Sequence, residues 1–521
     1  MELRLSPRSW RRLRQAVQVL ALLAFLGIFV YSNAQRPVRF WADLFSRLDP
    51  LLMASASLAG RVLVAGGLLA LVVVVVTLLF GRVWCGWLCP LGTLLEWLGP
   101  RRGRRRAGAP PEKLRVAKYL LLIAVLVAAV LGSQALISLD PITILNRTLT
   151  TAAWPALRHA VVQAEGFLYQ FSVLWGPLDA LHGAAIQPLF QEVQPVFTLG
   201  ILTGLFFLGL VALNWWAERF WCRYLCPLGG FLGLLSKLSL VRRQVGDDCA
   251  QCARCTHQCP TGTIDPRDGY RSDPAECIVC FDCLTDCTRE GIGFRWQLPR
   301  WRPARWRDYD PGRRQALAAA GGALAGVALL GIEPATRRDA ATLIRPPGAG
   351  QVDFSALCIR CAACVRVCPT QGLQPSLFGG GLGDLLTPRL VPRLGYCSFN
   401  CNACGQVCPT GAIPPLSLEE KQAAVIGLAR VDKDRCLPWA YDVPCIVCEE
   451  ACPVADKAIA LEEVQVAGDG GEVLTLQRPY VIKDLCIGCG ICEYQCPMGG
   501  ESAIRIYAPT FTAAFDGPPG T

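Results

Sequence analysis

The sequence predicts an α-helical membrane domain followed by small α+β domains that are rich in cysteine. Three observations support this fold class: 52% of the 521 residues are hydrophobic, long apolar stretches occupy the first half, and 28 cysteines recur at regular spacings. Such an apolar content is higher than that of ordinary soluble proteins. The chain is also long enough for two or three domains.

Four apolar stretches are each close to the ~20 residues that a membrane-spanning helix needs. They cover residues 16–33, 55–80, 119–137 and 196–214. Arginines gather before the first stretch, at 101–106 after the second and at 242–243 after the fourth, whereas the loop 138–195 has only Arg147 and Arg158. Because positive residues favour the cytoplasmic side, the amino terminus and the arginine-rich segments are predicted to be cytoplasmic. The loop 138–195 is predicted to lie on the opposite side.

The net charge of +10 does not require nucleic acid as a partner, since the arginines stand beside apolar segments, where the membrane explains them. The only histidines are His159, His182 and His257, and no C-x-x-C-H occurs. Haem is therefore not expected.

Most of the cysteines fall into six groups of four. The groups are Cys249, Cys252, Cys255 and Cys259; Cys277, Cys280, Cys283 and Cys287; Cys358, Cys361, Cys364 and Cys368; Cys397, Cys401, Cys404 and Cys408; Cys436, Cys445, Cys448 and Cys452; Cys486, Cys489, Cys492 and Cys496. The first, third and sixth read C-x2-C-x2-C-x3-C-P, whereas Thr288 replaces the proline in the second. This spacing is typical of 4Fe–4S clusters: three thiolates hold one cluster and the fourth reaches a neighbouring one.

Zinc and disulfides are the alternatives for these cysteines. Structural zinc typically uses two separated C-x2-C pairs, often with histidine, and cysteines three residues apart make poor disulfide frameworks. Six concordant groups favour six 4Fe–4S clusters with these 24 cysteines as iron ligands. The chain is thus predicted to conduct electrons.

The fourth cysteine of each group has more than one candidate destination. If the first two groups exchange these cysteines, Cys287 joins Cys249, Cys252 and Cys255, and Cys259 joins the second group. For the last four groups, exchange between adjacent groups and exchange between the first and the last fit the spacings equally well. His257 stands between two ligands and is expected to be a loop residue or to tune a cluster.

The four remaining cysteines belong to an internal repeat. Residues 80–98 and 218–235 both carry W-C-x2-L-C-P-L-G, which makes Cys85 and Cys89 equivalent to Cys222 and Cys226. Both pairs follow an even-numbered apolar stretch, which predicts a position at the cytoplasmic membrane surface. They could bind a metal, act as redox-active thiols or line a quinone pocket. Alternatively, they are small buried residues at a tight turn before proline.

A further apolar run, 315–332, follows Arg313 and Arg314 and resembles a twin-arginine export signal within the chain. It is predicted to be a fifth span, which would place the residues after it in the periplasm. The expected domains are a four-helix membrane domain (1–245), a two-cluster domain (246–300), a linker (301–345) and a four-cluster domain (346–521). We expect the last domain to fold only with its clusters.

These motifs resemble two known families. The two C-x3-C-P motifs and the two cluster groups of the first ~300 residues are similar to the NapH or MauN family. The residues from ~310 onward resemble the NapG or MauM family of four-cluster ferredoxins, including R-L-G-Y-C at 393–397 and C-G-Q-V-C-P-T-G-A-I at 404–413. The resemblance implies a fusion of the two, in a quinol dehydrogenase module that supplies a periplasmic reductase.

The leading hypothesis is a multi-pass protein of the bacterial inner membrane, with residues 246–300 cytoplasmic and 346–521 periplasmic. It would oxidise quinol from the membrane pool and pass electrons through its clusters to a periplasmic or membrane-anchored cytochrome or reductase. Electrons must then cross the membrane, where only Cys85, Cys89, Cys222 and Cys226 could carry them. Asp140 is a candidate proton acceptor, although a turn residue before proline is an alternative. Maturation of a client's metal centre is the alternative function.

Overall fold

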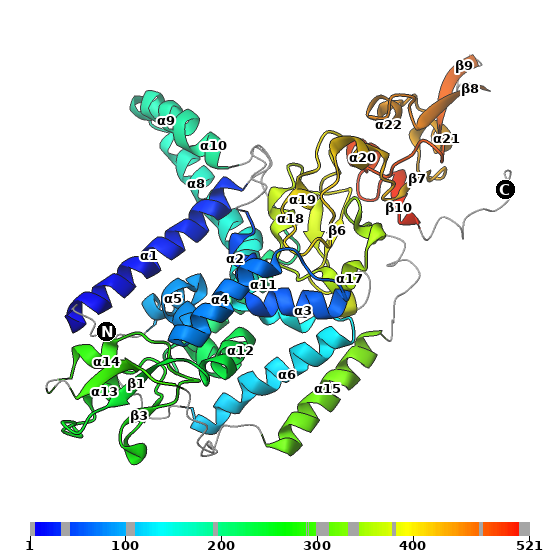
Figure 1. The fold of residues 1–521 in the computed structure, drawn as a ribbon. Coiled ribbons are helices and arrows are strands. Elements are labelled where there is room, and N and C mark those ends of the chain that lie inside the picture. The colour runs from blue at the N-terminus through cyan, green and yellow to red at the C-terminus, as the bar shows by residue number, and fades with distance from the viewer. Residues whose placement is uncertain are drawn as a thin grey trace. The chain divides into compact units, whose positions relative to one another are not determined.

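The structure is a computed structural model that describes residues 6–32, 42–99, 110–190, 196–287, 289, 291–298, 312–331, 343–377, 382–467 and 473–509. The chain divides into two compact units (Figure 1). Unit 1 comprises Met1–Tyr31, Asp43–Leu149 and Ile201–Ala328, and unit 2 comprises Ser32–Ala42, Thr150–Gly200 and Leu329–Thr521. The segment 150–200 therefore groups with the carboxy-terminal cysteine-rich region. The boundaries of the four domains expected from the sequence stay predictions.

Unit 1 is mostly helical. Its elements are α1 (Pro7–Tyr31), α2 (Leu44–Arg47), α3 (Pro50–Gly60), α4 (Gly67–Phe80), the π-helix η1 (Trp84–Leu88), α5 (Pro90–Trp97), η2 (Glu112–Arg115), α6 (Val116–Val130), η3 (Leu136–Leu139), α7 (Pro141–Thr148), α11 (Gly200–Leu213), the π-helix η7 (Trp221–Leu225), α12 (Pro227–Ser236), α13 (Arg254–Gln258), η8 (Pro266–Asp268), α14 (Asp282–Thr285) and α15 (Arg313–Gly331), with strands β1 (Val241–Val245), β2 (Ile264–Asp265), β3 (Arg271–Ser272) and β4 (Ile292–Trp296).

The centre of unit 1 is a helix bundle. Helix α6 packs against α3 and α12, and α4 packs against the same two helices. Leu51, Leu122 and Leu232 are almost completely buried. Helix α1 packs against η1 and α5, and it also contacts α14 in the two-cluster region. The bundle and the first cysteine-rich region therefore form one packed body.

The helices of the bundle differ from the predicted stretches in two places. Helix α6 ends at Val130, before the predicted end at 137, and Gly132 has φ 82° there. The prediction of one continuous helix over 55–80 is wrong, because α3 ends at Gly60 and α4 begins at Gly67. Arg61 adopts a left-handed conformation with φ 52°, which ends α3. Of the helices in the described part of the chain, only α1 is long and apolar enough to cross a bilayer by itself. Helices α3, α4, α11 and α12 are apolar but shorter.

The helix predicted over 315–332 is confirmed as α15, which Arg313 and Arg314 begin. The residues 308–311 before it, the arginines at 101–106 and Thr288 lie outside the described residues.

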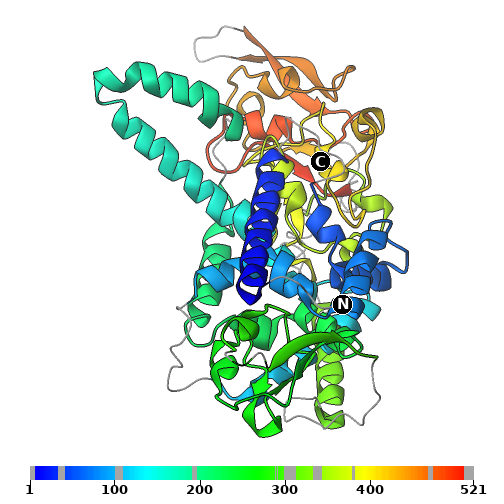
Figure 2. The same cartoon turned by 60° about the vertical axis from the view of Figure 1, so that its left-hand side comes forward.

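Unit 2 begins with a helical hairpin and continues as a region of short elements. Its elements are η4 (Leu149–Ala153), α8 (Trp154–Leu168), η5 (Ser172–Leu174), α9 (Trp175–Leu181), η6 (His182–Ile186), α10 (Gln187–Leu189), η9 (Ala349–Gln351), α17 (Phe354–Leu357), α18 (Ala363–Val367), β5 (Leu373–Pro375), η10 (Leu382–Asp384), β6 (Pro388–Leu390), α19 (Ala403–Gln406), α20 (Leu418–Ala423), β7 (Leu428–Val431), α21 (Leu437–Ala440), α22 (Val447–Glu450), β8 (Ile459–Ala467), β9 (Val473–Val481), α23 (Ile491–Gln495) and β10 (Ile504–Tyr507). Helices α8 and α9 are joined by a turn from which they diverge (Figure 2), and the Glu165 carboxylate of α8 pairs at 2.7 Å with the ring of His182, the first residue of η6.

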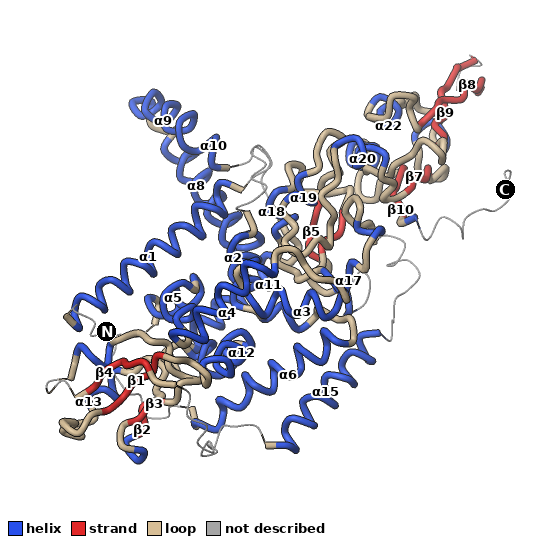
Figure 3. The backbone as a smooth tube through the Cα atoms, in the orientation of Figure 1, coloured by secondary structure: helices blue, strands red, loops and turns tan. Residues whose placement is uncertain are grey.

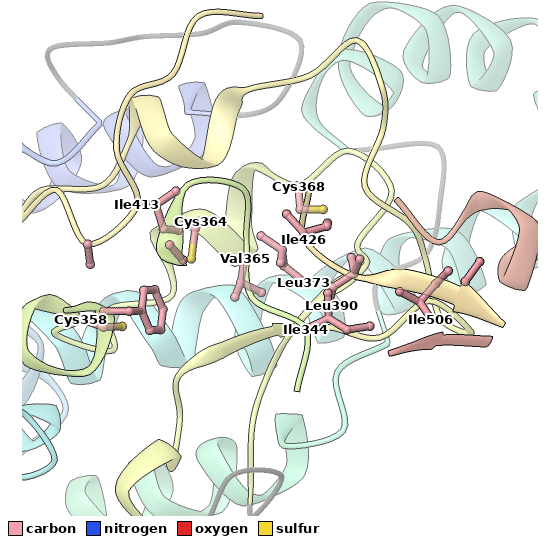
Figure 4. Close-up of a cluster of buried hydrophobic side chains, with 14 of the residues drawn as sticks. Ile344, Cys358, Cys364, Val365, Cys368, Leu373, Leu390, Ile413, Ile426 and Ile506 are labelled. Atoms are coloured by element: carbon pink, nitrogen blue, oxygen red, sulfur yellow. The ribbon is translucent and has the colours of Figure 1, made fainter. Parts of the chain in front are cut away.

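All described sheets have two antiparallel strands, and only β8 and β9, of nine residues each, are long (Figure 3). Strand β7 pairs with β10, β5 with β6, and β1 with β4. The apolar core of unit 2 is small, and cysteines make up part of it. Figure 4 shows Cys358, Cys364 and Cys368 in the same cluster as Val365 and Leu373. This cysteine content indicates that the core is organised around its thiols.

Candidate iron–sulfur sites

Three cavities of unit 2 are each lined by four cysteines. The lining sets are Cys397, Cys401, Cys404 and Cys368; Cys436, Cys445, Cys448 and Cys496; Cys486, Cys489, Cys492 and Cys452. Each set combines three cysteines of one group with the last cysteine of its neighbour. The fold thus brings together the residues that exchange between adjacent groups would require.

The remaining group follows the same rule. Cys364 interacts electrostatically with Cys358, Cys361 and Cys408, the last cysteine of the next group. The geometry does not favour an exchange of last cysteines between the first group and the last group of unit 2. Instead, the four groups form two pairs, 358–408 and 436–496, within which the last cysteines change places.

The C-x2-C-x2-C loops share one backbone conformation. In each of the four regular groups, the residue before and the residue after the second cysteine have positive φ: Gln251 and Ala253, Val279 and Phe281, Arg360 and Ala362, Gly488 and Gly490. Left-handed residues on both sides of a cysteine bend the chain sharply. The bend turns three thiols toward one centre, which explains why the spacing works as a ligand set.

Gly488 should not tolerate a side chain. A Cβ there would lie 2.3 Å from the Gly427 carbonyl oxygen, in addition to requiring φ +72°. We expect Gly488→Ala to destabilise the protein by about 2 to 5 kcal/mol, from left-handed strain plus overpacking. Thermal unfolding of the cluster-loaded protein measures this.

Gly500→Ala is the matched control, because Gly500 also has positive φ but meets no atom within 4 Å. It should cost only about 1–2 kcal/mol. Equal effects of the two substitutions would contradict the role assigned to the contact with Gly427.

The thiols are in surroundings that disfavour their bare ionised form. Burial raises the pKa of Cys489 and of Cys436 to about 11, and that of Cys448 to about 12. Backbone amides of Ala429 and Ala503 donate hydrogen bonds to Cys486 Sγ and Cys496 Sγ at 3.4 Å. Iron therefore has to supply the positive charge that makes these thiolates stable, and the donor sets fit such a group.

A single metal ion does not fit this arrangement. Among the residues that the structure describes, no three Cys, His, Asp or Glu side chains lie close enough to share one ion. A four-iron cubane spreads its thiolates around a larger core.

The two-cluster region in unit 1 is built in the same way. Cys259 interacts electrostatically with Cys277, Cys280 and Cys283, as the exchange rule requires. Cys287 packs in the same small core as Cys255. His257 belongs to α13 between two cysteines. That His257 tunes a cluster stays a prediction.

The two C-x3-C-P repeats fold alike. The first cysteine of each lies in a π-helix, η1 or η7, and the second caps the following helix. Gly92 N donates to Cys89 Sγ at 3.4 Å, and Gly229 N donates to Cys226 Sγ at 3.2 Å. Cys85, Cys89 and Cys226 are buried, and Cys222 is half-buried. Single-turn π-helices often mark functional positions.

Each repeat also supplies an arginine to the other. Arg82 approaches Gly229 of the second repeat and lies 3.9 Å from Cys85 Sγ. Arg219 donates to the Cys85 carbonyl oxygen at 2.9 Å, and its other nitrogen contacts Glu96. Both arginines are 1% exposed. Sequence reasoning missed this pair, although each arginine stands three residues before the first cysteine of its motif.

The first repeat lies directly against the two-cluster region. A Cβ on Gly86 would lie 2.2 Å from the Ile278 carbonyl oxygen, so glycine is needed for this approach. Trp87 Nε1 donates to the Val279 carbonyl at 2.9 Å, and Arg82 donates to the Ala275 carbonyl at 2.8 Å. In the second repeat, Arg223 takes the place of Gly86 and reaches toward Gly262.

Asp140 lies in unit 1, completely buried, beside a second buried carboxyl group, that of Asp49. Each caps a helix: Asp140 Oδ1 accepts from Ile142 N at 2.9 Å, and Asp49 Oδ1 accepts from Leu51 N at 2.9 Å. The two side chains interact with each other, and Oδ2 of each is buried without a hydrogen-bond partner. A proton shared between the carboxyls accounts for this arrangement. Sequence reasoning missed Asp49, although it stands before Pro50 just as Asp140 stands before Pro141.

Cysteine sets of this kind define an iron–sulfur protein that transfers electrons, and the comparisons with known proteins agree. A family model described as a 4Fe-4S binding domain matches residues 62–108 and 199–246, and a second with the same description matches 479–500. The chain is 36% identical over 204 residues to the methylamine utilization ferredoxin-type protein MauM of Methylorubrum extorquens, covering 38% of this chain and 89% of that protein.

Two other relatives are similar. The ferredoxin-type protein NapG of Escherichia coli is 36% identical over 195 residues, which is 37% of this chain and 82% of NapG. The protein NirI of Paracoccus denitrificans is 30% identical over 221 residues, 40% of this chain and 25% of NirI. The chain belongs to the MauM and NapG family of ferredoxin-type proteins. No solved structure matches it. The predicted likeness to MauM and NapG is confirmed, whereas fusion to a NapH or MauN protein stays a prediction.

Proposed function

We propose that this protein is a multi-pass protein of the bacterial inner membrane that oxidises quinol and passes the electrons to a periplasmic reductase system. Six 4Fe–4S clusters would carry the electrons, with the 24 grouped cysteines as ligands in the exchanged sets described above. A quinol releases two electrons and two protons on oxidation to quinone, and each cluster accepts one electron at a time. The two electrons therefore leave one after the other.

The single observation that carries the proposal is the composition of unit 2. From residue 150 onward, the loop between the third and fourth apolar stretches belongs to the same compact unit as the four-group cysteine region. The Arg366 guanidinium lies 5.0 Å from the Trp154 ring centre, and Gln374 Nε2 donates to the Val196 carbonyl at 3.1 Å. Since the arginine-poor loop is expected outside, the four-cluster region would be periplasmic too.

The two-cluster region (246–300) packs against the amino-terminal segment, which is expected on the other side of the membrane from the loop 138–195. Arg14 and Arg11, from the arginine-rich amino terminus, form ion pairs with Asp282. The amino terminus is expected to be cytoplasmic, which supports a cytoplasmic position for residues 246–300.

Helices α3, α4 and α11 are each too short to cross the membrane alone, so neighbouring turns and helices must complete each crossing. Among the helices that the structure describes, only α1 is long and apolar enough to cross by itself.

The Asp49–Asp140 pair is proposed as the acceptor of a proton from quinol. Two facing carboxyls that share one proton carry one negative charge, so the pair can take up one more proton and become neutral. Because the two electrons leave one after the other, the pair would accept each of the two quinol protons in turn and release each to water before the next. Its burial and its place beside the cysteine repeats, where Asp140 interacts electrostatically with Cys226, suit this role.

Substituting Asp140→Asn or Asp49→Asn tests the pair. Asparagine keeps an oxygen for the helix cap but cannot take up the proton. We expect quinol-dependent reduction of the clusters, followed by EPR in purified protein, to slow about 100-fold or more.

Dithionite, which needs no proton acceptor, should reduce all clusters of both variants as it does in the wild type. A wild-type rate with quinol in both variants would remove the pair from the mechanism. If no cluster of the wild-type protein is reduced across a range of quinol potentials, quinol oxidation itself is wrong. Maturation of a client's metal centre would then be the function to test.

A further inference from the structure

We propose that Cys85, Cys89, Cys222 and Cys226 together hold one more iron–sulfur cluster, of the four-thiolate 4Fe–4S class, which the two repeats build jointly. The inference deepens the proposed function by adding a carrier where the electron path lacks one. It does not depend on the identity of the donor.

The four thiols share one buried neighbourhood. Cys85, Cys89 and Cys226 are 8%, 6% and 5% exposed. The two repeats touch at this place, because Arg219, three residues before Cys222, donates to the Cys85 carbonyl oxygen at 2.9 Å. Cys89 and Cys226 each interact electrostatically with Cys85 and Cys222. The pair from one repeat therefore faces the pair from the other, and neither repeat completes a set of four by itself.

The local backbone prepares the sulfurs to bind metal. Cys89 and Cys226 each accept a backbone N–H at the start of a helix, α5 or α12. Such N–H···S bonds and the positive end of the helix favour the thiolate form. The positions that donate, Gly92 and Gly229, are glycines facing the other repeat's arginine, 3.5 Å and 2.9 Å from where a Cβ would be.

The charge around the site matches a cluster. Four thiolates around a 4Fe–4S core that carries two positive charges leave two negative charges in a buried place. Arg82 and Arg219, both 1% exposed, interact electrostatically with these cysteines, Arg82 with Cys85 and Cys226 and Arg219 with Cys222. Each arginine also pairs with a carboxylate, Arg82 with Glu276 at 3.6 Å and Arg219 with Glu96, and Glu276 pairs with the buried Lys118 too. Together the three cations exceed these two carboxylates, so positive charge is left over beside the four thiols.

The family match points to the same residues. The segments 62–108 and 199–246 both match a 4Fe-4S binding domain, yet each contains only one pair of cysteines. A 4Fe–4S cluster takes four protein thiolates. One site shared by both segments satisfies the description, and a separate site in each does not.

The site also has an electron partner next to it. Arg219 interacts electrostatically with Cys280 as well as with Cys222. Trp87 of the first repeat donates to the carbonyl of Val279, the residue before Cys280. The proposed cluster accepts one electron from a reduced neighbour and passes that electron on, and no bond forms or breaks.

Native mass spectrometry of the anaerobically purified full-length protein counts whole clusters and tests the inference. The wild type should hold one more cluster than Cys89→Ala and one more than Cys222→Ala. The double variant Cys89→Ala/Cys222→Ala should lose no more than either single one, since all share one cluster. Cys252→Ala, in the first ferredoxin group, is the matched control. The cluster lost in this variant should be a different one, so that the double variant Cys252→Ala/Cys89→Ala lacks both clusters.

An unchanged cluster count in both single variants overturns the inference. If the variants do not fold, the wild type decides: anaerobic alkylation of native protein should leave Cys85, Cys89, Cys222 and Cys226 unmodified until iron is chelated. Detection of a disulfide between any two of them, or chelation that leaves them unchanged, also overturns it. If the extra cluster is present but quinol reduces none of the clusters, the proposed function is wrong and the inference of an additional cluster still holds.

Discussion

Replacing Cys496 by alanine is expected to damage the cluster of a different cysteine group from its own. Cys496 lines the cavity of Cys436, Cys445 and Cys448, whereas its own group is completed by Cys452. After a brief treatment with an iron chelator that leaves the wild type intact, Cys436, Cys445 and Cys448 should become open to alkylation. Peptide mass spectrometry identifies the modified thiols.

The reciprocal variant is the control. Cys452→Ala should expose Cys486, Cys489 and Cys492 and leave the other set protected. Each alternative ligand scheme gives a distinct result. If Cys496→Ala exposed its own group, the last cysteines would not be exchanged. If it exposed Cys358, Cys361 and Cys364, the first and last groups would be the ones that exchange.

Complete removal of iron is expected to unfold residues 343–509. The described sheets there have two strands each, and cysteines such as Cys358, Cys364 and Cys492 are part of the buried core. Without iron, the thiols must be buried in protonated form with no bonds between the elements they join. For structural metal sites, the free energy of metal binding, about 10 kcal/mol or more, is also free energy of folding.

Limited proteolysis after anaerobic chelation measures this effect, and unit 1 provides an internal control. Helices α3, α4, α6 and α12 pack against each other through apolar side chains and contain no grouped cysteine. Far-ultraviolet circular dichroism should therefore retain most of the helical signal while residues 343–509 are digested. Protease resistance of this region in iron-free protein would show that its apolar core is sufficient.

The ligand groups could be predicted from sequence because each is local. Three thiols within seven residues need only the left-handed residues beside the second cysteine, as at Arg360 and Ala362, to face one centre. The partner of the fourth cysteine could not be predicted, because it depends on how α18 packs against α19 and α22 against α23. Several exchanges fit the same spacing until the packing selects one.

The helices of the first half were predictable from hydropathy only in part. Apolar composition continues through 55–80, yet the chain turns at Arg61, where a left-handed residue ends α3. Hydropathy cannot detect such a break, since the residues on both sides are apolar. The Asp49–Asp140 pair was hidden for a related reason: the two carboxyls are far apart in sequence and meet only after α3 and α7 are placed.

The two repeats are otherwise similar, but Gly86 of the first corresponds to Arg223 of the second. This difference makes the two faces of the duplicated structure unequal. On one side, backbone touches backbone at Ile278 with no side chain between, whereas on the other a long charged side chain intervenes. Electron tunnelling falls steeply with every ångström of separation. An electron carrier held by the two repeats would therefore exchange electrons faster across the Gly86 face than across the Arg223 face, and the reduction potentials of the partners would set the direction.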